Sequence, residues 1–317
     1  GWFYISINLG AFCSSLLTPW LLEGLPKWLE ETYPHLVPDD PEKLRQIGPH
    51  VAFGVPGLLM LVATVVFWMG RHKFIQIPPR GLKSVTDTLK GEGGWALVRL
   101  LPLFAFVAVF WALYDQTGSA WVLQAENMNR NFLGIEWREA QIQAINPALI
   151  LTLVPLFSYV IYPAVGRVMN FSPLRRVAVG MFLMVAADAV VAYAEQLIQI
   201  EAAKPEAERQ PPTILWQLGA YVLLTASEVM VSVTCLEFSY TQAPREMKSF
   251  IMSLYLASVS VGNDMTALVN YFIANPDGSS KLPGATYYWF FTGVMLVASI
   301  VFIPFALKFK EKTYLRE

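Results

Sequence analysis

The stretch FWALYDQTGSAWVLQA, residues 110–125, decides how this chain folds. It continues the apolar run LVRLLPLFAFVAVF without a break, yet it carries the carboxylate of Asp115, two indoles, a phenol and an amide. An ionised carboxylate near the bilayer centre costs roughly 2.5–3.5 kcal/mol, so such acids usually face a cavity or a partner. We expect one face of this helix to line an aqueous cleft, because four residues recur there at helical spacing: Trp111, Asp115, Gly118 and Val122.

The composition places the chain in the membrane class. Of its 317 residues, 55% are hydrophobic and only 15% are charged, and the mean hydropathy is +0.44. Repeated apolar runs of about 20 residues predict an all-α polytopic protein in a lipid bilayer. The formal net charge of −1 argues against a nucleic-acid partner.

Apolar runs of sufficient length predict eight transmembrane helices, with a Pro- and Gly-containing connection after the second. We expect three parts: residues 1–69, the connection 70–94, and a six-helix bundle over 95–317. The expected spans are Trp2–Leu22, Val51–Met69, Leu97–Leu123, Ile142–Val165, Leu174–Ile198, Leu215–Leu236, Phe250–Ile273 and Tyr287–Leu307.

The distribution of Lys and Arg predicts the orientation. Fifteen lie in the connections on the side of residues 70–94 and of the carboxy terminus, and eight lie on the opposite side. Because cytoplasmic loops carry the excess of positive charge, we expect a multi-pass protein of the cell (inner) membrane with its carboxy terminus in the cytoplasm.

Further polar residues interrupt the apolar helices. Glu228, with Ser227 beside it, stands in LLTASEVMVSVTCLEF, where a carboxylate is suited to substrate or proton work. The amides of Asn8 and Asn146 can hold a peptide-like group, although bonding between helices explains them nearly as well. No metal-ligand spacing, nucleophile elbow or phosphate loop stands out, so we expect no enzyme, no catalytic residue, no metal and no cofactor.

Three segments carry a family resemblance: FYISINLG, residues 110–121, and NPALILTLVPLFSYVIYP. In that order they resemble FYxxINxG, FWALxDQxGSxW and NxxxIxxxxPxFxxxxYP, which are motifs of the proton-dependent oligopeptide transporter family of the major facilitator superfamily. SEVMVSVTCLEFSYTQAPREMKS and the later SVGN extend the likeness over nearly the whole chain. The resemblance implies a fold of twelve helices, of which about eight are present.

The resemblance also implies roles for single residues. Glu228 corresponds to the glutamate that binds the peptide amino terminus, and Asn146 to the amide beside it. Asn8 corresponds to the side-chain amide that contacts the peptide backbone. Trp111 corresponds to the indole that lines a pocket for a peptide side chain. Tyr255 stands where many members have Trp. With Ser227, these residues form the expected substrate site; Asp115 and Glu228 are the expected proton-coupling and gating acids.

The family's ExxER motif and the basic residues of its early helices have no counterpart in this chain. By the resemblance, the chain then spans the last two helices of the amino-terminal bundle and the whole carboxy-terminal bundle. We expect that it needs the four missing helices for alternating access.

The function implied is proton-coupled symport of di- and tripeptides, with peptide, protons and lipid as partners. The sequence leaves two alternatives open. The same fold could carry nitrate, an amino acid or a peptide-like metabolite, or the chain could be a peptide receptor without transport.

Overall fold

A computed structural model describes residues 2–36, 38, 40–74, 92–244 and 247–309. The chain forms two compact units, Gly1–Gly81 and Leu82–Glu317. Most of the expected connection 70–94 lies outside the described residues.

The first unit consists of two long helices joined by shorter turns. It comprises α1 (Trp2–Pro19), the π-helical turn η1 (Trp20–Gly24), α2 (Leu25–Thr32), the 3₁₀ turn η2 (Pro34–Leu36) and α3 (Pro41–Met69). Asp40 caps α3 by accepting a hydrogen bond from the Glu42 N–H at 3.0 Å. A Cβ at Gly48 would overlap the backbone of Leu22, so glycine lets α3 pack directly against η1.

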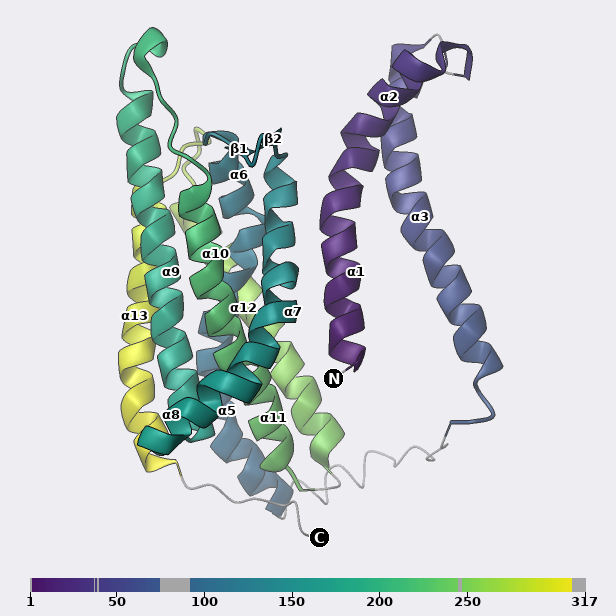
Figure 1. Cartoon of the computed structure of the whole chain (residues 1–317). Coiled ribbons are helices and arrows are strands. Elements are labelled where there is room, and N and C mark those ends of the chain that lie inside the picture. The colour runs from purple at the N-terminus through teal and green to yellow at the C-terminus, as the bar shows by residue number, and fades with distance from the viewer. Residues whose placement is uncertain (1, 37, 39, 75–91, 245–246, 310–317) are drawn as a thin grey trace. The chain divides into compact units, whose positions relative to one another are not determined.

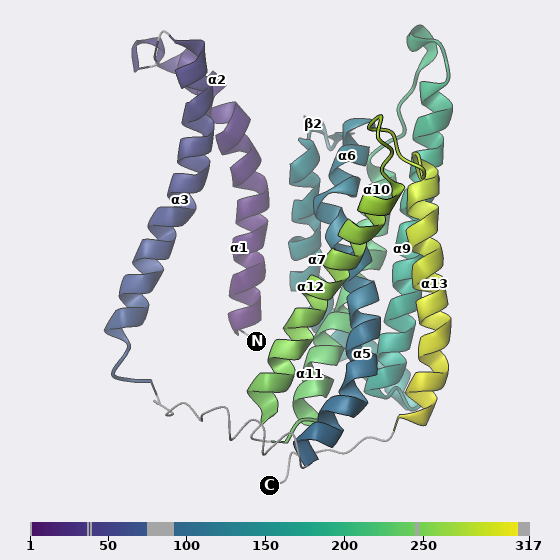
Figure 2. The ribbon, with the colours of Figure 1, turned by 180° about the vertical axis from the view of Figure 1, so that it is seen from behind.

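The second unit is a bundle of long helices, and a small hairpin lies at one end of it, between α6 and η4 (Figures 1 and 2). Its elements are α5 (Glu92–Tyr114), η3 (Asp115–Gly118), α6 (Ala120–Glu126), β1 (Asn131–Phe132), β2 (Ile135–Glu136), η4 (Glu139–Ala144), α7 (Ile145–Leu156), η5 (Phe157–Ile161), α8 (Tyr162–Val168), α9 (Pro173–Ala202), η6 (Glu206–Glu208), α10 (Leu215–Glu228), η7 (Val229–Val233), α11 (Thr234–Thr241), α12 (Lys248–Ile273) and α13 (Ala285–Lys308).

Within this bundle, α9 packs against both α10 and α13, and α12 packs against α5. Small residues allow the close approaches. A Cβ at Gly180 would collide with Met230 and Val231, and one at Gly262 would collide with the backbone of Ala108. Close backbone contact of this kind is how helices associate in lipid, where burial of apolar surface gives little drive.

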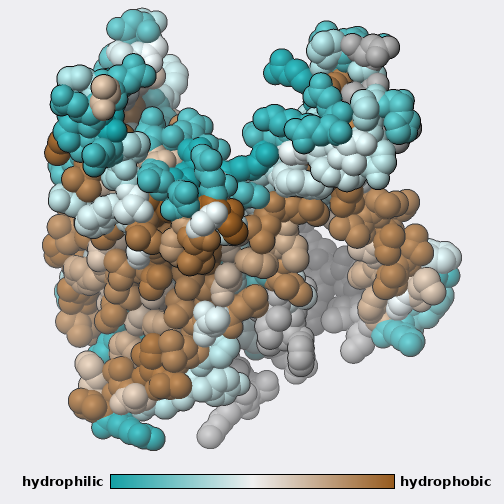
Figure 3. Space-filling view, turned by 45° about the horizontal axis from the view of Figure 1, so that its top comes forward, coloured by the Kyte–Doolittle hydropathy of each residue, from teal (hydrophilic) through white to brown (hydrophobic). Residues whose placement is uncertain are grey.

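Within the described residues, six helical stretches are long and apolar enough to cross a membrane. They are Pro41–Met69, Gly93–Glu126, Glu139–Val168, Pro173–Ala202, Leu215–Thr241 and Ala285–Lys308. Each matches an expected span, and the two remaining expected spans correspond to the helices α1 and α12, outside these six. On the face shown in Figure 3, hydrophobic residues cover the middle of each unit and hydrophilic residues gather at its ends.

The expectation of one continuous face along residues 110–125 is wrong. Asp115–Gly118 form a 3₁₀ turn, and an α-helix resumes only at Ala120. Since a 3₁₀ turn has three residues per turn, the 3.6-residue period is lost, and Val122 does not continue the face of Trp111. Two π-helical turns, η5 and η7, break other helices in the same unit, the first between Pro155 and Pro163.

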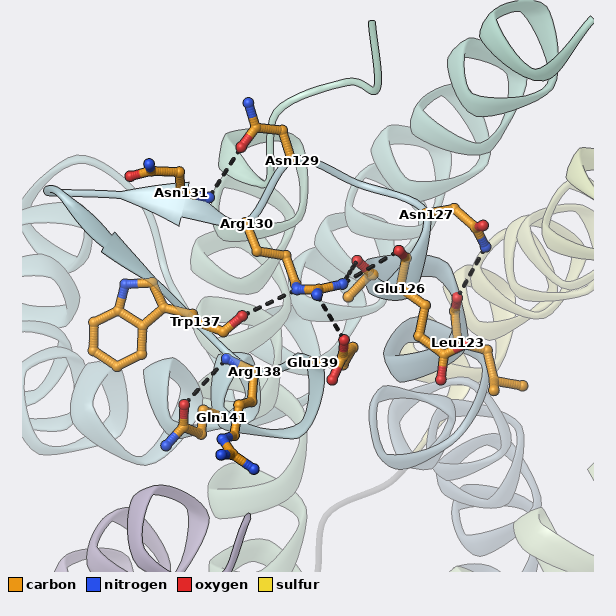
Figure 4. Close-up of polar contacts among 11 residues, drawn as sticks. Leu123, Glu126, Asn127, Asn129, Arg130, Asn131, Trp137, Arg138, Glu139 and Gln141 are labelled. Atoms are coloured by element: carbon orange, nitrogen blue, oxygen red, sulfur yellow. Dashed lines mark hydrogen bonds and ion pairs between the residues drawn. The ribbon is translucent and has the colours of Figure 1, made fainter. Parts of the chain in front are cut away.

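Arg130 holds the hairpin that follows α6 (Figure 4). Its guanidinium donates to the carbonyls of Trp137 at 3.0 Å, Ala125 at 3.1 Å and Glu126 at 3.2 Å. It also pairs with the Glu139 carboxylate at 2.8 Å. Because the last carbonyls of a helix have no intrahelical partners, this one side chain ends α6 and joins it to the start of η4.

Candidate functional site

Glu228 is the centre of a polar cluster in the second unit. It is the last residue of α10, and the π-helical turn η7 begins at the next residue. Its side chain is only 8% exposed, and its Oε2 lies 2.9 Å from both the Tyr114 hydroxyl and the Asn146 amide nitrogen. A nearly buried carboxylate is thus held by two neutral donors from other helices.

Asn146 connects the members of this cluster. Its Nδ2 donates to Glu228 and, at 3.1 Å, to the Thr225 hydroxyl, while its Oδ1 lies 3.1 Å from the Tyr114 hydroxyl. The single proton of Tyr114 can therefore be donated to either the amide or the carboxylate. α5, α7 and α10 each contribute to the cluster, which fixes the rotamer of Glu228.

Asp115, the residue after Tyr114, makes a second polar contact. Its Oδ2 accepts a hydrogen bond from the Asn263 amide on α12 at 2.7 Å. Close by, the Thr266 hydroxyl donates to the Ala112 carbonyl at 2.9 Å and joins α12 to α5. Asp115 begins the 3₁₀ turn η3, so this contact sits where α5 is interrupted.

Trp111 and Tyr255 contact α5 and η7, which hold or adjoin the residues of the Glu228 cluster. The Trp111 ring meets the Tyr114 ring edge to face, with centroids 4.9 Å apart, and lacks a hydrogen-bond partner for its indole N–H among the described residues. The Tyr255 hydroxyl donates to the Ser232 carbonyl at 3.0 Å, within the π-helical turn η7. The Trp111 indole thus packs against Tyr114 on α5 itself. The Tyr255 phenol, on α12, is held by η7, the turn that follows Glu228.

The other two expected site residues lie elsewhere. Ser227 is fully buried and donates its hydroxyl to the Gly180 carbonyl at 2.6 Å, so it joins α10 to α9 and does not enter the Glu228 cluster. Asn8 belongs to α1 in the first unit. The structure therefore brings Glu228 and Asn146 together directly, with Trp111 next to their partner Tyr114.

Four polar residues of this site were missed by sequence reasoning: Tyr114, Thr225, Ser232 and Asn263. Tyr114 stands in the stretch quoted first, one residue before Asp115, and Thr225 precedes Glu228 by one helical turn. Thr225 was available from its i,i+3 spacing to Glu228, and Tyr114 from its i,i+3 spacing to Trp111. Asn263 and Ser232 could not be found this way, because their contacts come from packing between different helices.

The electrostatics of the cluster are unbalanced. Within the described part of the chain, neither Glu228 nor Asp115 has a Lys, Arg or His at ion-pair distance, whereas Arg130–Glu139 and Lys204–Glu201 are ion pairs elsewhere in the second unit. A carboxylate with neutral donors on one oxygen keeps capacity on the other for a cation. The arrangement suits recognition of an ammonium group.

A bundle of long apolar helices with a buried polar cluster around the Glu228 carboxylate defines a polytopic α-helical membrane protein, and solved structures agree. A structure described as an auto-inhibited POT family peptide transporter matches with a TM-score of 0.76 at 27% identity, over 99% of this chain and 71% of that one. The POT family transporter PepTSo matches with a TM-score of 0.75 at 29% identity, over 97% of this chain and 70% of that one. The sequence matches the POT family over residues 1–91 and 84–290, and the chain belongs to that family.

Curated relatives agree with this membership. Solute carrier family 15 member 2 of Homo sapiens is 35% identical over 266 residues, which is 73% of this chain and 34% of that protein. Peptide transporter family 1 of Drosophila melanogaster is 32% identical over 57% of this chain and 27% of that protein. The chain thus spans about a third of the length of the curated relatives it matches.

Proposed function

We propose that this protein acts in proton-coupled symport of di- and tripeptides. The observation that carries the proposal is the Glu228 carboxylate, held on one oxygen by Asn146 and Tyr114 and close to no cation among the described residues. A peptide amino terminus supplies that missing cation, and a charge-assisted hydrogen bond is about twice as strong as a neutral one. Relatives described as peptide transporters support the choice of cargo.

The proposed substrate site contains Glu228 and Asn146 as the amine-binding pair, with Tyr114 and Thr225 as their supports. Trp111 and Tyr255 provide aromatic walls for a peptide side chain. For Asn8, which belongs to the first unit, we separately propose a contact with a peptide backbone. Ser227 has a different proposed role, because its hydroxyl is already engaged by Gly180. It keeps α10 in place against α9.

Proton coupling is proposed for the two acids, Asp115 and Glu228. Protonation removes the charge that holds an ammonium or a cationic side chain, and so lets one set of helices move against the other. One proton crossing 100 mV supplies about 2.3 kcal/mol, which supports roughly 50-fold accumulation of substrate. No catalytic step and no cofactor is needed for such a cycle.

The proposed setting is the cell (inner) membrane, with the carboxy terminus in the cytoplasm. Residues 1–69 are proposed to belong to the amino-terminal bundle of a twelve-helix transporter, 70–94 to the connection, and 95–317 to the carboxy-terminal bundle. In this assignment the helices that complete the amino-terminal bundle supply the cations for the peptide carboxylate, and alternating access needs both bundles.

The other cargoes of this fold are less favoured. Nitrate carries no ammonium group, and a carboxylate without a nearby cation would repel it. A free amino acid has an amine but not the length of a dipeptide between its termini. A peptide receptor without transport would share the site, so only a flux measurement separates it from a symporter.

A binding test addresses the cargo and the role of Glu228 together. Displacement of a labelled dipeptide would be measured with dialanine, N-acetyl-dialanine, alanine and nitrate as competitors. We expect dialanine to compete and N-acetyl-dialanine, which lacks the ammonium, to fail. Equal competition by the acetylated peptide would contradict an amine-binding carboxylate, and absence of competition by dialanine would contradict a peptide cargo.

A further inference from the structure

A pocket of about 480 Å³ lies at the end of the second unit opposite the hairpin, between α5 and α13. It is lined by Val98, Pro102, Pro304, Phe305 and Phe309, together with two cations, Arg99 and Lys308. Both cations belong to helices expected to cross the membrane, close to their ends on the same side. None of these residues takes part in the Glu228 cluster.

Proline and aromatic residues explain why the space exists. Pro102 and Pro304 both lie inside their helices, where a proline ring keeps the local backbone from packing tightly. The floor is aromatic, since the Phe305 ring lies 5.5 Å from the Phe106 ring and 5.6 Å from the Phe309 ring between centroids. Interlocked rings make this wall firm and apolar.

The described lining residues of the pocket carry charge of one sign. Among the described residues, its lining contains Arg99 and Lys308 and no Asp or Glu. The space therefore favours a ligand with a negative group at the level of these two side chains. The planar guanidinium of Arg and the flexible ammonium of Lys can both donate hydrogen bonds to phosphate oxygens.

The side chains beside the pocket indicate what the ligand contains besides its negative group. Trp95, Val98 and Leu101 on α5, and Ile303 and Leu307 on α13, present exposed apolar side chains beside it. In a membrane protein such surfaces face acyl chains, and an exposed Trp near a helix end is typical of the interface with the headgroups. The ligand thus has an anionic head at the membrane surface and an apolar tail beside the helices.

We propose that this pocket binds one anionic glycerophospholipid, with its phosphate between Arg99 and Lys308 and an acyl chain against Pro102 and Phe305. Basic pockets between transmembrane helices on the cytoplasmic side bind anionic headgroups in this way. The bound lipid joins α5 to α13. The membrane leaflet follows from the proposed orientation, but binding itself is independent of both orientation and cargo.

The test uses the full chain purified in a neutral detergent and titrated with dioleoyl-phosphatidylglycerol or dioleoyl-phosphatidylcholine. Native mass spectrometry counts the lipids retained by each molecule. We expect one phosphatidylglycerol to be retained at concentrations where phosphatidylcholine is not. The R99Q/K308Q double variant should need about 30-fold more phosphatidylglycerol, because each cation near a membrane surface contributes about a factor of five to six.

A matched control removes two other cations from the same end of the bundle. Arg167 and Arg175 are exposed and line no part of this pocket, so the R167Q/R175Q variant should retain phosphatidylglycerol like the unchanged protein. The R99K/K308R variant, which keeps both charges, should bind within a few-fold. A single gel-filtration peak and an unchanged thermal unfolding temperature show that each variant is folded.

Three results would overturn the proposal. The first is equal retention of the two lipids, and the second is equal loss in the R99Q/K308Q and R167Q/R175Q variants. The third is displacement of the lipid by millimolar inorganic phosphate, since that result would describe an anion site without a lipid.

Discussion

The Asn146 amide on α7 donates to the Glu228 carboxylate on α10 across 2.9 Å, although 82 residues separate them in the sequence. The same amide also donates to Thr225, which fixes its orientation. Because the amide and the carboxylate hold each other, the oxygen presented to a ligand is set before the ligand arrives. This preorganisation is what a site for a peptide amine needs.

Replacing Glu228 by Gln should weaken dipeptide binding about 10- to 100-fold, since a hydrogen bond to a charged group contributes about 1.5–3 kcal/mol. It should also abolish the dependence of uptake on an imposed proton gradient. Binding is measured by displacement of labelled dialanine. Glu237→Gln serves as the control, because Glu237 is exposed nine residues further along and is expected to leave binding unchanged.

Tyr114→Phe removes one hydroxyl from the cluster and keeps the ring that packs on Trp111. We expect dipeptide affinity to fall by about 2- to 10-fold, the effect of one hydrogen bond of about 0.5–1.5 kcal/mol. Thr225→Val should have a smaller effect in the same direction, because Thr225 contacts Asn146 and makes no hydrogen bond to Glu228. An effect of Thr225→Val larger than that of Tyr114→Phe would contradict the geometry described.

Gly262→Ala should destabilise the second unit by about 1–3 kcal/mol, because the added Cβ would collide with the Ala108 carbonyl and force α12 away from α5. Gly219→Ala is the matched control on α10, where a Cβ would meet no described heavy atom within 4 Å. That change should be neutral or stabilise the helix by about 0.5–1 kcal/mol. Thermal unfolding in detergent distinguishes them, and equal effects would argue against close packing at Gly262.

Arg130→Met should destabilise the protein by about 1.5–3 kcal/mol, because it removes donors from three backbone carbonyls and leaves Glu139 without its partner. The Arg130 side chain is only 18% exposed, so solvent replaces these bonds poorly. Glu139→Gln should cost less, since the carbonyl contacts survive. Thermal unfolding of both variants checks this order, and the reverse order would show that the ion pair dominates.

Much of this fold could be predicted from hydrophobic runs alone. Every expected span is largely helical, because about 20 apolar residues in succession leave no other stable structure in lipid. The breaks within the helices could not be predicted. The 3₁₀ turn at Asp115 and the π-helical turn after Glu228 depend on how neighbouring helices satisfy the freed backbone groups, which spacing does not report.

The site was partly predictable for the same reason. Glu228 stands out in sequence because a carboxylate in an apolar run is costly. Asn146 stands out as an amide in such a run, and the family resemblance implied its place beside Glu228. Ser227 lies next to Glu228 in sequence, yet successive helical residues point in different directions, and it contacts α9 instead. The contact between Asp115 and Asn263 needed the packing of α12 on α5.

The most direct measurement is uptake of a labelled dipeptide into liposomes, with and without an inward proton gradient. Two proteins would be assayed: the chain by itself, and the chain fused to the amino-terminal helices of a solved POT family transporter. We predict accumulation by the completed protein only when the gradient is present, and its loss in the Glu228→Gln variant. Uptake that is absent, or that ignores both the gradient and Glu228, would contradict proton-coupled peptide symport.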